Sequence, residues 1–194
     1  MMRIITGTAR GVRLRTLEGE ETRPTAERTK EAVFSMIQFE LVGRRILDAF
    51  AGSGQMGLEA LSRGARTALL IDKNRSAAEI IKKNVELTRM GEKAEVVCGD
   101  AADCLKRRAG REQYDIVFLD PPYKSELIKQ TLNRLIEYEM LSENATVVCE
   151  SGEPLPLLLK DDPELLEKIN VVKTAKYGIA HITFVKLRKE GDQE

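Results

Sequence analysis

Residues 48–57 read DAFAGSGQMG, and this stretch decides how the chain on either side of it is interpreted. The mostly apolar run at residues 45–50 predicts a strand, and the segment at residues 55–63 predicts a helix. Glycines in GxGxxG spacing lie between the two, which is the context that a nucleotide-binding motif requires. The stretch therefore indicates a strand, a glycine loop and a helix, with a ligand bound at the loop.

Predicted strands and helices alternate along the rest of the chain. Further strands are expected at residues 67–72, 94–100, 114–119, 145–151, 170–176 and 180–187. Further helices are expected from residue 26 onward and at residues 74–89, 101–108, 125–139 and 163–169. The helix at residues 74–89 is expected to have a capping box at residues 76–79. This pattern predicts an α/β protein with a doubly wound, mostly parallel sheet of about seven strands and helices on both faces. A small N-terminal β-hairpin is expected before it, at residues 2–17.

Four of the predicted strands end at an aspartate. These residues are Asp48, Asp72, Asp100 and Asp120. In open α/β sheets, ligands bind outside the carboxyl ends of the strands, near the point where the strand order reverses. A row of carboxylates at these ends therefore predicts a polar ligand along that edge of the sheet.

The glycine loop alone leaves two cofactors open. Asp72 lies 20 residues after Gly52, a spacing that suits the ribose of a nicotinamide dinucleotide. However, Asp48 would be poorly placed beside a pyrophosphate and would suit an ammonium group. Asp100 could lie near an adenine or its sugar. A ligand with an ammonium, a ribose and an adenine but no phosphate is S-adenosylmethionine, which we expect as the cofactor.

Longer segments carry a family resemblance. The segments DAFAGSGQMGLEALSRGA, LLID and FLDPPY resemble the class I S-adenosylmethionine-dependent methyltransferases, which have a Rossmann-like fold. DPPY is similar to the [DNS]PP[YF] motif of the enzymes that methylate exocyclic or amide nitrogens. With MRIITGTARGVRL and RPTAERTKEAVFSMI, roughly residues 2–187 resemble the RsmD family, bacterial enzymes that methylate a guanine N2 in small-subunit ribosomal RNA. The resemblance thus implies a ribosomal RNA (guanine-N2)-methyltransferase, with 16S ribosomal RNA and the small ribosomal subunit as partners.

The expected cofactor site lies on the first three strand ends. Its residues are Asp48, Ala49, Phe50, Gly52, Gly54, Asp72, Lys73, Asp100 and Ala101. Gly52 and Gly54 could instead serve a helix-entry turn, and Asp100 could instead cap the following helix. Arg23 and Thr25 are placed near the cofactor by the family's RPT segment, although a linker turn explains them equally well.

The expected catalytic residues are Asp120, Pro121, Pro122 and Tyr123. An exocyclic amine is a poor nucleophile because its lone pair is delocalised into the ring. The Asp120 carboxylate and the Pro121 carbonyl could accept its two N–H groups and direct the lone pair, with the two prolines fixing the turn. Tyr123 could stack on the unstacked base. The alternative is a tight turn after a buried strand.

The N-terminal segment is basic. Residues 1–17 hold four arginines and no acid, so this segment carries +4 and the remainder −4, since the net charge is zero. We expect Arg10 and Arg13 to contact RNA phosphates, although an exposed structural hairpin would also fit. The expected organisation is a basic hairpin and linker at residues 1–25, a methyltransferase domain at residues 26–188 and a disordered tail at residues 189–194.

Composition excludes several classes of protein. With 42% hydrophobic and 32% charged residues among 194, the chain is typical of a single globular domain. No segment predicts a membrane span or signal peptide, so we expect a cytoplasmic protein. We also expect a monomer. One histidine, and three cysteines without CxxC spacing, predict no metal site. The alternative functions are a DNA adenine-N6 methyltransferase, a protein-glutamine methyltransferase and an RNA-binding module without catalysis.

Overall fold

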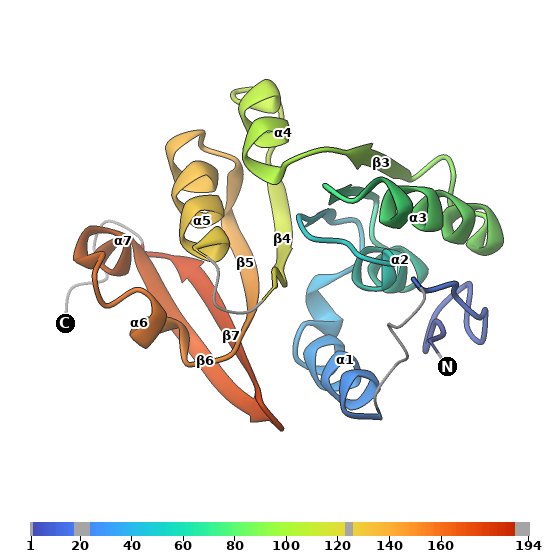
Figure 1. The fold of residues 1–194 in the computed structure, drawn as a ribbon, viewed down its shortest axis with the longest axis horizontal. Coiled ribbons are helices and arrows are strands. Elements are labelled where there is room, and N and C mark those ends of the chain that lie inside the picture. Colours follow the sequence, from blue (N-terminus) through green and yellow to red (C-terminus); the bar gives the residue numbers. More distant parts are fainter. Residues whose placement is uncertain (1, 18–23, 123–125, 189–194) are drawn as a thin grey trace.

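The structure is a computed structural model that describes residues 2–17, 24–122 and 126–188. Within these residues seven strands form one sheet, in the order β3-β2-β1-β4-β5-β7-β6 (Figure 1). The strands are β1 (Arg45–Asp48), β2 (Thr67–Asp72), β3 (Ala94–Cys98), β4 (Tyr114–Leu119), β5 (Leu141–Ser151), β6 (Ile169–Tyr177) and β7 (Ala180–Leu187). Strands β1 to β5 pair in parallel, and β7 is antiparallel to β5 and β6.

The strand order reverses between β1 and β4. The chain proceeds outward from β1 to β3 and then returns to place β4 on the other side of β1. Such a reversal opens a crevice at the carboxyl ends of the two central strands. The prediction of a doubly wound, mostly parallel sheet of about seven strands is confirmed.

Helices cover both faces of the sheet. They are α1 (Pro24–Met36), the short 3-10 helix η1 (Gln38–Glu40), α2 (Gln55–Ser62), α3 (Arg75–Thr88), α4 (Ala101–Arg108), α5 (Leu127–Glu137), α6 (Leu155–Leu158) and α7 (Pro163–Lys168). One buried cluster joins the sheet to α1, α2 and α3, and a second joins it to α4, α5, α6 and α7. Alternate strand residues serve the two clusters: Ile46 belongs to the first and Leu47 to the second. Burial on both faces explains why the central strands are nearly continuous apolar runs.

The arm, defined as residues 2–17, is more irregular than the expected hairpin. A single isolated antiparallel bridge joins Arg3 and Arg13, and the structure assigns no strand to the arm. The chain turns between Gly7 and Gly11, which both have positive φ. The pairing is therefore shorter than a hairpin of two strands.

Buried polar side chains of α2 and α3 anchor the arm. Glu59 accepts two backbone N–H groups of the arm, at 2.7 and 3.0 Å. The Ser62 hydroxyl accepts the N–H of Ala9 at 3.0 Å. Asn84 exchanges two hydrogen bonds with the backbone of Arg15, at 2.8 and 2.9 Å. Because these side chains are buried and find their partners on the arm, they fix its position against the helices.

The expected domain boundaries fall largely outside the described residues. Residues 18–23 of the linker and the tail at residues 189–194 are not described, and α1 begins at Pro24, before the expected boundary at residue 26. In the described part of the chain, no helix is both long and apolar enough to span a bilayer.

Candidate active site at the carboxyl ends of the strands

A cleft of about 550 Å³ lies at the carboxyl ends of β1 to β5. All of the predicted cofactor residues except Gly54 line it, together with Asp120, Pro121 and Pro122. Tyr123 lies outside the described residues, as does Arg23, and Thr25 falls in the first turn of α1. The fold thus brings the predicted cofactor residues and the described part of the DPPY motif to one cavity.

Asp48, at the end of β1, is a buried acid with few hydrogen bonds. Its Oδ2 accepts the N–H of Gly57 at 3.2 Å. Its pKa is raised to about 7, chiefly by burial and also by the charge of Asp72, against the opposing hydrogen bonds from Gly57 and Phe50. A carboxyl group that is costly to ionise here would be stabilised in its charged form by a cation in the cleft.

The three glycines of the loop serve different purposes. Gly52 has a φ of +54° and open space where a side chain would begin, so its backbone is accessible from the cleft. Gly54 is the residue before α2, with a φ of +78°, and it packs against Ile81 away from the cleft lining. A Cβ on Gly57 would lie 2.1 Å from Leu70, so this glycine permits close packing of α2 on β2. The helix-entry alternative therefore describes Gly54, while Gly52 is the glycine that borders the cleft.

Asp72 and Asp100 each bind backbone groups as well as lining the cleft. Asp72 accepts the N–H of Gly52 at 2.8 Å and that of Asn74 at 2.8 Å. Asp100 is the N-cap of α4, where its Oδ1 accepts the N–H groups of Ala102 and Asp103. The capping alternative is thus observed for one oxygen of Asp100. Lys73 and Ala101 line the cleft beside these two aspartates.

Asp120 lies just beyond the end of β4, at the point where the strand order reverses. It is exposed at the edge of the cleft, although protein surrounds its carboxylate on several sides. Restricted hydration raises its pKa well above the usual range, and the nearby charges of Glu150 and Asp48 raise it further. The site therefore concentrates acidic groups around Asp120, which makes it attractive to N–H donors.

Among the lining residues that sequence reasoning missed, Glu150, Met2 and Leu17 are the most informative. Glu150 lies near the end of β5, and Met2 and Leu17 come from the two ends of the arm. The Ser53 hydroxyl donates to the sulfur of Met2 at 2.9 Å. Glu150 could have been found by applying the strand-end rule to the segment ATVVCES, whereas no local signal places the ends of the arm beside the glycine loop.

The arginines of the arm lie outside the cleft. Arg10 and Arg13 are exposed, and Arg10 belongs to the turn that packs on the end of α2 at Ser62. Arg15 is also exposed and lies nearer to the cleft, because Asn84 binds its backbone as well as the carbonyl of Ser53. The arm thus presents the exposed side chain of Arg15 close to the glycine loop, and those of Arg10 and Arg13 farther from it.

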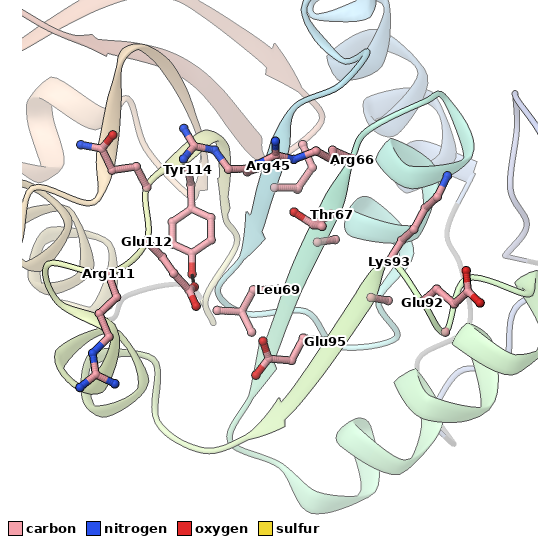
Figure 2. A pocket seen from close by; sticks show the side chains of 15 residues that line it. Arg45, Arg66, Thr67, Leu69, Glu92, Lys93, Glu95, Arg111, Glu112 and Tyr114 are labelled. Atoms are coloured by element: carbon pink, nitrogen blue, oxygen red, sulfur yellow. Dashed lines mark hydrogen bonds between the residues drawn. The ribbon is translucent and has the colours of Figure 1, made fainter.

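A second cavity, of about 570 Å³, opens at the amino ends of the central strands (Figure 2). Two of its charged side chains have polar partners at close range: Arg45 binds Asp115 at 2.9 Å, and Glu112 accepts the Tyr114 hydroxyl at 2.6 Å. Burial would raise the pKa of Asp115, but the hydrogen bonds from Arg45 outweigh this effect, so the pKa lies below its usual range. The glycine loop and residues 120–122 lie at the opposite edge of the sheet, so this cavity is not the candidate active site. No group of three or more histidine, cysteine or acidic side chains in the described ranges is placed to hold a metal.

Comparisons with known proteins agree with this arrangement. The family described as Conserved hypothetical protein 95 matches residues 2–186. The Bacillus subtilis protein YlbH is 36% identical over 188 residues, covering 96% of this chain and 100% of the relative. Ribosomal RNA small subunit methyltransferase D of Haemophilus influenzae is 36% identical over 168 residues, covering 86% of this chain and 87% of the relative. The solved structure of the Escherichia coli protein yhhF superposes with a TM-score of 0.83 at 30% identity, covering 97% of this chain and 99% of the other.

Proposed function

Because this chain belongs to the family described as Conserved hypothetical protein 95, the RsmD family of methyltransferases, we propose that it methylates the exocyclic N2 amine of a guanine in 16S ribosomal RNA, with S-adenosylmethionine as donor. The observation that carries the proposal is that Asp120, Pro121 and Pro122, the described part of the DPPY motif, line the cleft that also contains Asp48 and the glycine loop. The relatives named as small-subunit ribosomal RNA methyltransferases supply the class of substrate.

The cleft suits the proposed donor. Asp48 would pair with the ammonium group, and the open backbone of Gly52 would border the methionine part. Asp72, whose oxygens each accept one backbone N–H, retains lone pairs for the ribose hydroxyls. Asp100 would contribute the oxygen that is not used in capping α4 to the adenosine end. No side chain in this set requires a phosphate, which favours this donor over a dinucleotide.

The acceptor side of the site directs a weak nucleophile. Bound S-adenosylmethionine would supply a methyl group that passes from sulfur to nitrogen, with the C–S electron pair returning to sulfur. The Asp120 carboxylate and the Pro121 carbonyl would hold the two N–H groups of the amine and direct its lone pair. Asp120 would then take the surplus proton of the methylated nitrogen. The raised pKa of Asp120 makes it a better proton acceptor than an ordinary aspartate.

The proposal is tested by methyl transfer to small ribosomal subunits. Subunits purified from a strain that lacks the gene are incubated with the protein and S-adenosylmethionine carrying a tritiated methyl group. The RNA is then digested to nucleosides. We expect the label in N2-methylguanosine of 16S RNA, and little incorporation into subunits from the parent strain, whose site is already modified. Label in N6-methyladenosine, or in ribosomal protein, would contradict the proposal.

A further inference from the structure

Two acidic side chains lie side by side at the rim of the cleft. Strands β4 and β5 are parallel neighbours, and their register pairs Leu119 with Cys149. Asp120 directly follows the last residue of β4, and Glu150 is the next residue of β5. Neighbouring strands lie about 4.8 Å apart in such a sheet. Adjacent positions in register point to the same face, so the two carboxylates are neighbours across the sheet edge.

Burial of the preceding residues shows which face this is. Phe118 and Val148 belong to the cluster on the side of α1 to α3, whereas Leu119 and Cys149 belong to the opposite cluster. By alternation, the side chains of Asp120 and Glu150 return to the side of α1 to α3. Both also line a smaller cavity of about 100 Å³, against α1, that adjoins the cleft. The charge of Glu150 raises the pKa of Asp120, which agrees with this close placement.

The nucleobases differ at the ring atom next to the exocyclic amine. In guanine, the N2 amine adjoins N1–H, so both neighbouring groups are hydrogen-bond donors. In adenine the N6 amine adjoins N1, and in cytosine the N4 amine adjoins N3, and both of these ring nitrogens are acceptors. A carboxylate beside the amine would therefore bind guanine and repel the other two bases.

We propose that Glu150 accepts the N1–H of the target guanine while Asp120 holds its N2 amine, so that Glu150 selects guanine among the bases that carry an exocyclic amine. This role rests on the proposed function. It assigns the two neighbouring carboxylates to two neighbouring donors on one edge of the base. Enzymes that act on an extruded base read its Watson–Crick edge in this manner.

The test uses a base that keeps the N2 amine but lacks the N1 proton. 16S RNA with either guanine or 2-aminopurine ligated at the methylated position is assembled into small subunits. Single-turnover methyl transfer is measured for the wild type and for Glu150→Gln and Glu150→Ala. The wild type should prefer guanine, and each variant should lower the guanine to 2-aminopurine rate ratio by about tenfold or more, because a charge-assisted hydrogen bond to N1–H is lost. Taking a ratio for each variant cancels general losses of activity.

The control is Glu153→Gln, which removes the same charge from an exposed position outside the cleft lining and should leave the ratio unchanged. Affinity for S-adenosylmethionine is measured for every variant and should stay near the wild-type value. An unchanged ratio in both Glu150 variants, with wild-type methylation of guanine intact, would overturn the role of Glu150 alone. If the wild type does not methylate the substrate that carries guanine, the proposed function fails first.

Discussion

Asp48 should make cofactor binding depend on pH. Its pKa is raised to about 7 by burial, so at lower pH it must lose a proton before it can pair with an ammonium. Affinity for S-adenosylmethionine should therefore rise about tenfold per pH unit below pH 7 and level off above it. It should fall again above about pH 8, where an α-ammonium loses its proton. Calorimetry across this range measures the profile.

Asp48→Asn supplies the control for this profile. Its affinity should be lower than that of the wild type and nearly flat from about pH 6 to pH 7.5, since the amide does not titrate. Equal binding of S-adenosylmethionine by Asp48→Asn and the wild type at every pH would place the ammonium elsewhere.

The raised pKa of Asp48 acts on stability in the opposite sense. Between about pH 4 and pH 7 the folded protein holds a proton on Asp48 that the unfolded chain has released, so the free energy of unfolding falls as pH rises through this window.

Two aspartates of the cleft should separate catalysis from binding. Asp120→Ala removes the acceptor for the target amine and should slow single-turnover methyl transfer about a hundredfold or more, with cofactor affinity unchanged. Asp72→Ala should raise the cofactor dissociation constant about ten- to a hundredfold, with much of the rate restored at saturating cofactor. Asp72 also holds the N–H of Gly52, so part of its effect comes from a looser glycine loop. Near-normal turnover by Asp120→Ala would contradict the proposed chemistry.

The arginines of the arm should act on RNA and not on the cofactor. Arg10→Ala with Arg13→Ala should weaken RNA binding and reduce the slope of its salt dependence by about two, because each phosphate contact releases counterions. The matched control is Arg66→Ala with Arg111→Ala, which removes the same charge from the cavity at the opposite sheet edge (Figure 2). Filter binding at several salt concentrations measures both. A salt slope that both double variants leave unchanged would show that the arm is only structural.

Two glycines of the arm offer a matched test of its docking. Both have positive φ, but a Cβ on Gly7 would lie 1.8 Å from the carbonyl oxygen of Ser62, whereas one on Gly11 would meet nothing within 4 Å. Gly11→Ala should cost about 1 kcal/mol of stability for its backbone alone. Gly7→Ala should release the arm from α2, seen as faster proteolysis within residues 2–17. Equal proteolysis of both variants would contradict the close contact.

Elements with strong burial were predictable, and elements defined by long-range packing were not. The spans of β2, β4 and β7 agree with the apolar runs that predicted them, because strands buried on both faces leave a continuous signal. The capping box predicted at residues 76–79 is wrong. Asn74, and not Ser76, is the N-cap of α3, and its side chain accepts the N–H of Ser76. Asparagine and serine both suit an N-cap, so the sequence alone did not distinguish the two positions. The short helices η1 and α6 were missed because such short segments show no periodicity. The docking of the arm depends on Glu59 and Asn84, which lie far away in sequence.

The whole protein should respond to its cofactor by mass action. S-adenosylmethionine at about a hundred times its dissociation constant should stabilise the fold by about 2.7 kcal/mol, because the cleft exists only when β1 to β5 are assembled. The melting temperature should therefore rise with cofactor concentration in calorimetry. NAD at the same concentration is the control and should leave it unchanged. Stabilisation by NAD alone would restore the dinucleotide interpretation of the glycine loop.

The anchoring of the arm also has a consequence for the order of events during synthesis. The arm is synthesised before its partners Glu59 and Asn84, which lie 53 to 69 positions later in the chain than the residues they bind. Its backbone groups must therefore stay hydrated until α2 and α3 have been made and packed on the sheet. Since a chain is synthesised from its N-terminus onward, the arm is made before α2 and α3 but takes its final position only after they have packed. One wall of the cleft, formed by Met2 and Leu17, is thus completed only after the glycine loop behind it is in place.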